Sequence, residues 1–261
     1  MLKKLNIFSQ ILYIFANLLL ILFIPKDKIN NFLSIYSIFS ILFGILVFIL
    51  FSKFALKIKF FSKIIFVISC IIIYLNEWSL IIVLYTLLIF LADYGASQTL
   101  KNYQNFIFKL LIFLSTVPLV INAISFDQII YLRLILFLAV ISFIFLSSQS
   151  VKKLNLNHSY LYVIFSHLFY FSPLFLLTMF YKDLDLKIIF IFTQIMFSIP
   201  LKIFDFEIRF KTKLFKNNFV QYIPLILFSF PLFLEFGLIF LAIYTSGLLL
   251  IFQTIKLCQI N

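Results

Sequence analysis

The chain has 261 residues, of which 64% are hydrophobic and 11% are charged, and its formal net charge at pH 7 is +12. Soluble globular proteins are about 45–50% apolar, so this composition excludes an ordinary soluble domain. The positive charge could suggest a nucleic-acid partner, but the 21 Lys and Arg residues are spread over short gaps between apolar runs. That placement is typical of a protein that crosses a bilayer repeatedly, and we expect membrane lipids, not nucleic acid, as its partners.

Apolar stretches long enough to cross about 30 Å of hydrocarbon as helices recur along the whole sequence. They predict an all-α, polytopic transmembrane helix bundle with about ten spans. The predicted spans are residues 6–24, 31–52, 62–77, 79–98, 105–124, 128–148, 160–180, 186–204, 219–235 and 237–255. Because the third is short and the ninth carries Pro224 and Pro231, counts of eight or nine are alternatives.

The charged gaps predict the orientation of the bundle. If the N-terminus is cytoplasmic, the opposite side holds only five basic residues, Lys26, Lys28, Arg133, Lys182 and Lys187, and the other sixteen are cytoplasmic. Cytoplasmic loops of membrane proteins carry an excess of Lys and Arg, so this split predicts that both termini are cytoplasmic. We expect a multi-pass protein of the cell inner membrane. No gap is long enough for a soluble domain, and residues 1–261 are expected to form one integral membrane domain.

Motifs for a cofactor or metal are missing from the sequence. The four glycines are too few and too scattered to assemble a phosphate-binding loop. His158 and His167 lack the neighbouring Glu or second His that a metal site would require. We therefore expect no cofactor, no metal and no catalytic residue.

Ionisable residues within the predicted spans are the candidates for function, because a charge inside a bilayer costs several kcal/mol unless it is paired or hydrated. Asp93 lies shortly before the cytoplasmic end of the fourth span, among small residues that would let another helix approach closely. Lys109 enters the next, antiparallel span at a similar depth. The sequence predicts an ion pair between them, either as a structural contact or as a contact to substrate or proton. Further polar residues that could line a water-filled cavity are Asn17, Asn122, His167, Gln194, Lys202 and Glu235.

Three parts of the chain carry a resemblance to a known family: Ile11 to Ile24 with the following turn and helix start at Pro25 to Ser37, the polar turn Ser97 to Asn105, and Thr193 to Asp205. Their arrangement is similar to that of polysaccharide (lipid-linked oligosaccharide) flippases of the multidrug/oligosaccharidyl-lipid/polysaccharide superfamily. The resemblance implies transport of a lipid-linked saccharide during surface polysaccharide export.

For such a transporter we expect a polar cavity exposed alternately to each side of the membrane. Basic residues that face the cavity would bind a diphosphate or an acidic sugar, and the candidates are Lys109, Arg133 and Lys202, with Asp93 as a further substrate contact.

Two other classes of protein are left open by the sequence. A membrane enzyme acting on a lipid at the cytoplasmic rim could use Asp93, Asp205, Glu207 and His167 as acids or bases. An assembly subunit would have no activity of its own. Inward-facing Lys109 and Asp93 would favour the transporter, a rim cleft with Asp205 and Glu207 the enzyme, and a bundle with all charges at its surface the assembly subunit.

Overall fold

The computed structural model describes residues 2–53, 58–99 and 102–147, together with 167 and 171. The chain divides into two compact units, residues 1–156 and 157–261, and the described helices belong to the first. Apart from these two single positions, the four predicted spans that begin at residue 160 lie outside the described residues, as do Gln194, Lys202 and Glu235.

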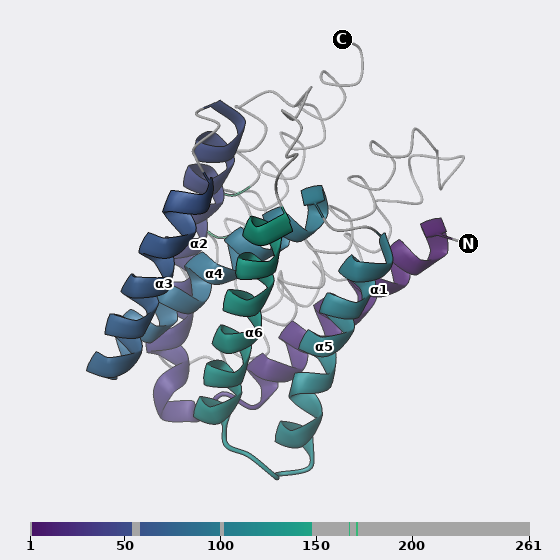
Figure 1. Cartoon of the computed structure of the whole chain (residues 1–261). Coiled ribbons are helices and arrows are strands. Elements are labelled where there is room, and N and C mark those ends of the chain that lie inside the picture. Colours follow the sequence, from purple (N-terminus) through teal and green to yellow (C-terminus); the bar gives the residue numbers. More distant parts are fainter. Residues whose placement is uncertain (1, 54–57, 100–101, 148–166, 168–170, 172–261) are drawn as a thin grey trace, which may run out of the picture. The chain divides into compact units, whose positions relative to one another are not determined.

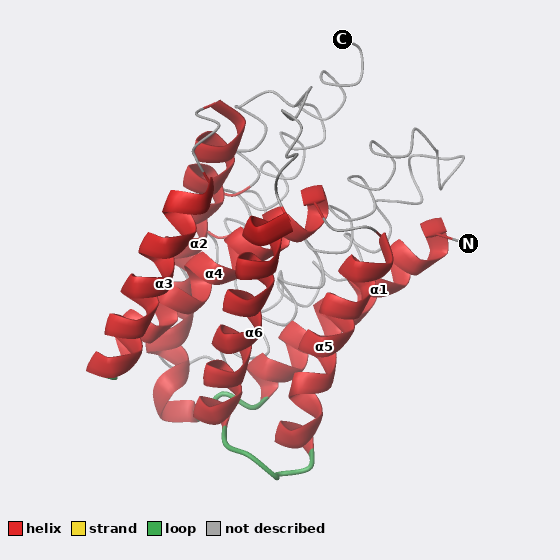
Figure 2. Ribbon diagram, in the orientation of Figure 1, coloured by secondary structure: helices red, strands yellow, loops and turns green. Residues whose placement is uncertain are grey.

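The first unit is helical throughout its described part (Figures 1 and 2). Its helices are α1 Leu2–Leu22, α2 Lys26–Lys53, α3 Ile58–Leu75, α4 Trp78–Thr99, α5 Asn102–Val120 and α6 Phe126–Ser147. Each corresponds to one of the first six predicted spans, so the all-α class is confirmed for this part of the chain.

Four of the described helices are long and apolar enough to cross a membrane, namely α2, α4, α5 and α6. The apolar parts of α1 and α3 are shorter, at Phe8–Leu22 and Lys63–Leu75. Large hydrophobic side chains are exposed on the outside of the bundle, for example Val67, Ile71, Leu114 and Ile135. Long apolar helices that expose many large hydrophobic side chains are suited to lipid and not to water, so the chain is a membrane protein.

Polar residues set the helix ends at one side of the unit. Ser125 and Gln128 form a reciprocal capping box at the start of α6, with the Ser125 backbone N–H donating to Gln128 Oε1 at 2.8 Å. Asn76 and Asn122 follow the ends of α3 and α5 with φ of 53° and 55°, a left-handed conformation that asparagine tolerates and that stops a helix. The prediction that Asn122 lies within a span is therefore wrong, because it occupies an exposed turn after α5.

Helix α4 is central and packs against α2, α3, α5 and α6, whereas α1 packs mainly along α5. The α1 and α5 helices run in the same direction, since Phe8 stacks on Phe106 near the start of both, with ring centroids 6.1 Å apart. At the far end of α4, a Cβ on Gly95 would lie 2.6 Å from Ile144 Cδ1. Gly95 thus allows α6 to approach α4 closely, as predicted from the small residues around Asp93.

Candidate functional site: a polar interior in an apolar bundle

Arg133 is the most unusual side chain in the described bundle, because it is fully buried in a membrane helix. Its guanidinium makes four hydrogen bonds. Nε donates to Ser115 Oγ at 3.2 Å, Nη1 to Tyr85 OH at 3.0 Å and to Asn17 Oδ1 at 3.4 Å, and Nη2 to the Ala16 carbonyl at 2.8 Å. These partners come from α1, α4 and α5, so Arg133 on α6 joins four helices at one point.

All four partners of Arg133 are neutral. Within the described ranges no carboxylate forms an ion pair with it. Arginine stays protonated in proteins, so a full positive charge is held inside the bundle by dipoles alone. The Ser115 hydroxyl is oriented for this task because it donates its own proton to the Ile112 carbonyl at 2.6 Å, which leaves a lone pair for the guanidinium.

The sequence counted Arg133 among the basic residues on the side opposite the cytoplasm, in a predicted span of residues 128–148. Helix α6 begins at Phe126, so Arg133 lies two turns, or roughly 10 Å, inside it. Its side chain is fully buried and turns into the bundle. The sequence also suggested that Arg133 faces the interior of the bundle, and the observed burial agrees with that orientation.

The predicted pair of Asp93 and Lys109 is present. Lys109 Nζ lies 3.4 Å from Asp93 Oδ1, which links α4 to the antiparallel helix α5. The two side chains differ sharply in exposure, at 2% for Lys109 and 34% for Asp93. The Lys109 ammonium group is thus buried in the interior, whereas the Asp93 carboxylate is partly exposed. Whether either residue contacts a substrate stays a prediction.

Tyr13 was missed in the sequence, and it lies beside Lys109 on the helix face whose next turn binds Arg133. Lys109 Nζ is 5.2 Å from the centroid of the Tyr13 ring, a cation–π contact. One turn further along α1, Ala16 and Asn17 bind Arg133. Residues 13, 16 and 17 share one face of a helix. This spacing in the sequence could have identified Tyr13 as a neighbour of a charged residue that binds to the same face.

Three buried polar atoms near Lys109 have no hydrogen-bond partner among the described residues. They are the Tyr13 hydroxyl, Gln10 Oε1 and Asn105 Oδ1. Gln10 precedes Tyr13 by three residues on α1, and Asn105 precedes Lys109 by four on α5, so all lie on the facing sides of the same helix pair. Unsatisfied buried polar groups are few in native proteins and generally have a reason, such as a bound group or an internal water.

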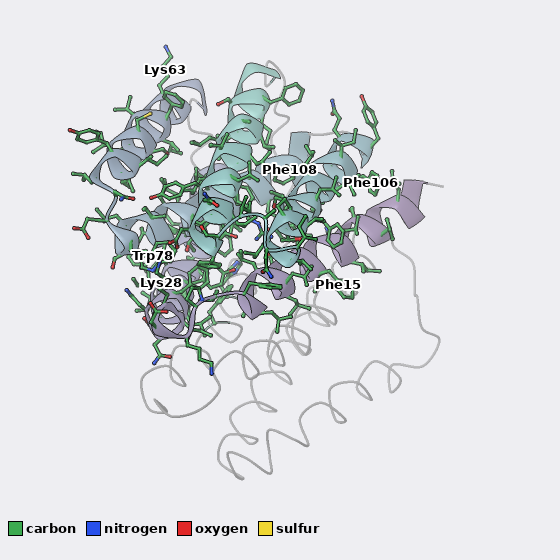
Figure 3. The ribbon with its side chains drawn as sticks, turned by 90° about the horizontal axis from the view of Figure 1, so that it is seen from below. Phe15, Lys28, Lys63, Trp78, Phe106 and Phe108 are labelled. Atoms are coloured by element: carbon green, nitrogen blue, oxygen red, sulfur yellow. The ribbon has the colours of Figure 1, made fainter. Side chains whose placement is uncertain are left out.

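A second charged cluster lies where α2, α4 and α6 begin. Lys28 Nζ lies 2.8 Å from Asp127 Oδ2 and 3.0 Å from Oδ1, and 4.7 Å from the centroid of the Trp78 ring (Figure 3). Trp78 also contacts Phe126 with ring centroids 6.0 Å apart. Lys28 and Asp127 each lie in the first turn of a helix, so their contact places the starts of α2 and α6 at one end of the bundle.

The structure describes two of the four residues proposed for the enzymatic alternative, Asp93 and His167. Asp205 and Glu207 lie outside the described residues, and the His167 ring stacks on Phe171 at 6.5 Å. Within the residues that were described, no group of three or more His, Cys, Asp or Glu side chains could hold a metal ion.

Comparison of this chain with known protein families, with curated proteins and with solved structures finds no match.

Proposed function

We propose that the protein is a membrane transporter that flips an amphipathic, anionic substrate, a lipid-linked saccharide, during surface polysaccharide export. In this proposal it has about ten spans with both termini in the cytoplasm and resides in the cell inner membrane. The single observation that carries the proposal is the buried Arg133, a permanent cation held deep in an apolar helix bundle without a carboxylate partner among the described residues.

The interior charges favour an anionic substrate. Arg133 and Lys109 bring two positive charges into the bundle, and Asp93 brings one negative charge. The described interior therefore has an excess of positive charge in a region of low dielectric, where an anion would be strongly attracted. A diphosphate or an acidic sugar carried on a lipid has this chemistry, while its lipid tail can stay in the membrane.

A transporter also needs ends that open and close around its site. Lys28, Asp127 and Trp78 hold the first turns of three helices together at one end of the described bundle. The ion pair is partly exposed, so water can replace it at low energetic cost. That property suits a contact that breaks and reforms during transport.

The other two classes of protein have less support. An assembly subunit has no need for buried cations, which cost several kcal/mol each to place inside a membrane. A rim enzyme would need Asp205 and Glu207 near Asp93, and both of these residues lie outside the described part of the chain.

Neutralising the interior charges tests the proposal. In a strain that lacks the native gene, R133Q, K109Q and D93N are each expected to lower surface polysaccharide at least tenfold, because the substrate's headgroup loses its binding groups or its place in the cycle. K63Q is the matched control, since Lys63 is an exposed basic residue that points away from the bundle (Figure 3). Variants should be compared at equal membrane abundance, together with flipping of a fluorescent lipid-linked saccharide in proteoliposomes. Unchanged flipping by R133Q and K109Q would rule out the proposal.

A further inference from the structure

Tyr13 lies on the face of α1 that meets both buried cations of the bundle. Its ring faces Lys109 at 5.2 Å, and the α1 residues that bind Arg133 lie one turn away on the same face. The phenol also interacts electrostatically with both Arg133 and Asp93. Tyr13 therefore lies beside Lys109 and one helical turn from the two α1 residues that bind Arg133.

The Tyr13 hydroxyl is a donor that lacks an acceptor. Tyr13 is 7% exposed, and its oxygen has no hydrogen-bond partner among the described residues. A buried hydroxyl that serves only in side-chain packing almost always forms a hydrogen bond. With Lys109 beside the ring and Arg133 bound one turn away on the same helix, the acceptor that fits here is an anionic oxygen, which would accept a charge-assisted hydrogen bond from the phenol.

Asp93 holds the position that such an anion would need at Lys109. Its carboxylate is 3.4 Å from the ammonium group, and its side chain is 34% exposed. A carboxylate on the accessible side can turn outward and be rehydrated, whereas the sealed Lys109 cannot leave. Arg133 differs, because neutral groups occupy four of its five N–H groups and hold it in place whether or not an anion is bound.

We propose that the Tyr13 hydroxyl, Lys109 and Arg133 form a binding site for the anionic headgroup of the substrate, a phosphate or diphosphate, and that Asp93 is a resident counter-ion which the headgroup displaces from Lys109. This inference rests on the proposed function and assigns the groups that recognise its substrate. In the unliganded protein Asp93 neutralises Lys109. On binding, the headgroup oxygens take its place and accept the Tyr13 proton in a hydrogen bond, with no covalent change.

The mechanism predicts that two changes to the site act in opposite directions. D93N removes the competing anion and should tighten binding of an anionic headgroup about tenfold, a factor that corresponds to 1.4 kcal/mol. Y13F removes the unpaired hydroxyl but keeps the ring beside Lys109, and it should weaken binding about tenfold. K109M removes a charge and should weaken binding more than Y13F does.

The probe is radiolabelled farnesyl diphosphate, bound at equilibrium to the full-length protein in lipid nanodiscs. Farnesol, which has the same tail without the charge, is the matched ligand. Y103F and E77Q are the matched protein controls, because Tyr103 and Glu77 are exposed. Both controls should bind the probe as the unmodified protein does.

Folding does not obscure the result for Y13F. The lost hydroxyl has no hydrogen-bond partner within the described helices, so the Tm of Y13F should equal or exceed that of the unmodified chain. A Y13F protein with unchanged affinity for the probe would overturn the inference, as would weaker binding by D93N or equal binding of farnesol.

Binding and flipping separate this inference from the proposed function. If R133Q abolishes flipping while probe affinity is insensitive to D93N and Y13F, the counter-ion site is wrong and the transporter proposal stands. If affinity follows the predicted order while flipping is unaffected by every variant, the site stands and the transporter proposal fails.

Discussion

Arg133 and Lys28 are both basic residues near the start of a helix at the same end of the bundle, yet their surroundings are opposite. Arg133 is fully buried and bound only to neutral groups from three helices. Lys28 is about one-third exposed and lies within 3.0 Å of both oxygens of Asp127. Of these two cations, the one with no carboxylate partner among the described residues is the one that is fully buried.

The difference matters because burial changes what a charge costs. An exposed ion pair can be broken at little cost, since water or lipid headgroups rehydrate both partners. A buried cation has lost its hydration entirely, and each hydrogen bond to it offsets part of that loss. We therefore expect stability to depend steeply on the fit around Arg133 and weakly on the Lys28 pair.

The sharpest test of this contrast is R133K against R133M. Lysine keeps the desolvation cost but cannot reproduce the planar fork that reaches Ser115 and Tyr85 at once, so R133K should lose about 3 kcal/mol of unfolding free energy. Methionine removes the charge together with its cost, and R133M should lose less than R133K. Denaturant unfolding in a mild detergent measures both. If R133K were the more stable of the two variants, the charge and not the fork would be the structural requirement.

The neutral partners of Arg133 provide the next test. Y85F removes one hydrogen bond to a charged group in a buried site and should cost about 2 kcal/mol. Y103F is its matched control, because Tyr103 is 47% exposed and its removal should change stability by less than about 0.5 kcal/mol. Equal losses for the two variants would mean that the Tyr85 bond contributes nothing specific to the interior.

The six described helices could be predicted from the sequence because apolar length alone decides where a chain can cross a bilayer. Their ends were less predictable. Ile121 extends the apolar run of α5, so hydropathy carries the predicted span past Val120, whereas the backbone stops there and Asn122 turns with positive φ. A local backbone choice of this kind leaves no trace in a hydropathy pattern.

The site was only partly predictable for a related reason. Asp93 and Lys109 could be paired from their depth in two consecutive helices, which requires topology alone. The location of Arg133 depends on how α6 is rotated against α1, α4 and α5, and on a neutral polar group from each of them. No spacing within α6 encodes these partners, and the same holds for Tyr13, which looks like one of many aromatic residues in an apolar helix.

The exposed pair of Lys28 and Asp127 should give the smallest effect. K28Q and D127N should each lower the unfolding free energy by less than about 1 kcal/mol, because both partners already contact solvent. The combined charge reversal, K28D with D127K, should recover most of any loss, since it restores opposite charges at the same contact between α2 and α6. Raising the salt concentration should weaken the unmodified contact but leave R133K and R133M as far apart as before, because buried charges are screened much less than exposed ones. A loss of 3 kcal/mol or more for K28Q would remove the distinction between the two cations, and the end of the bundle would then be a fixed structural contact and not one suited to opening.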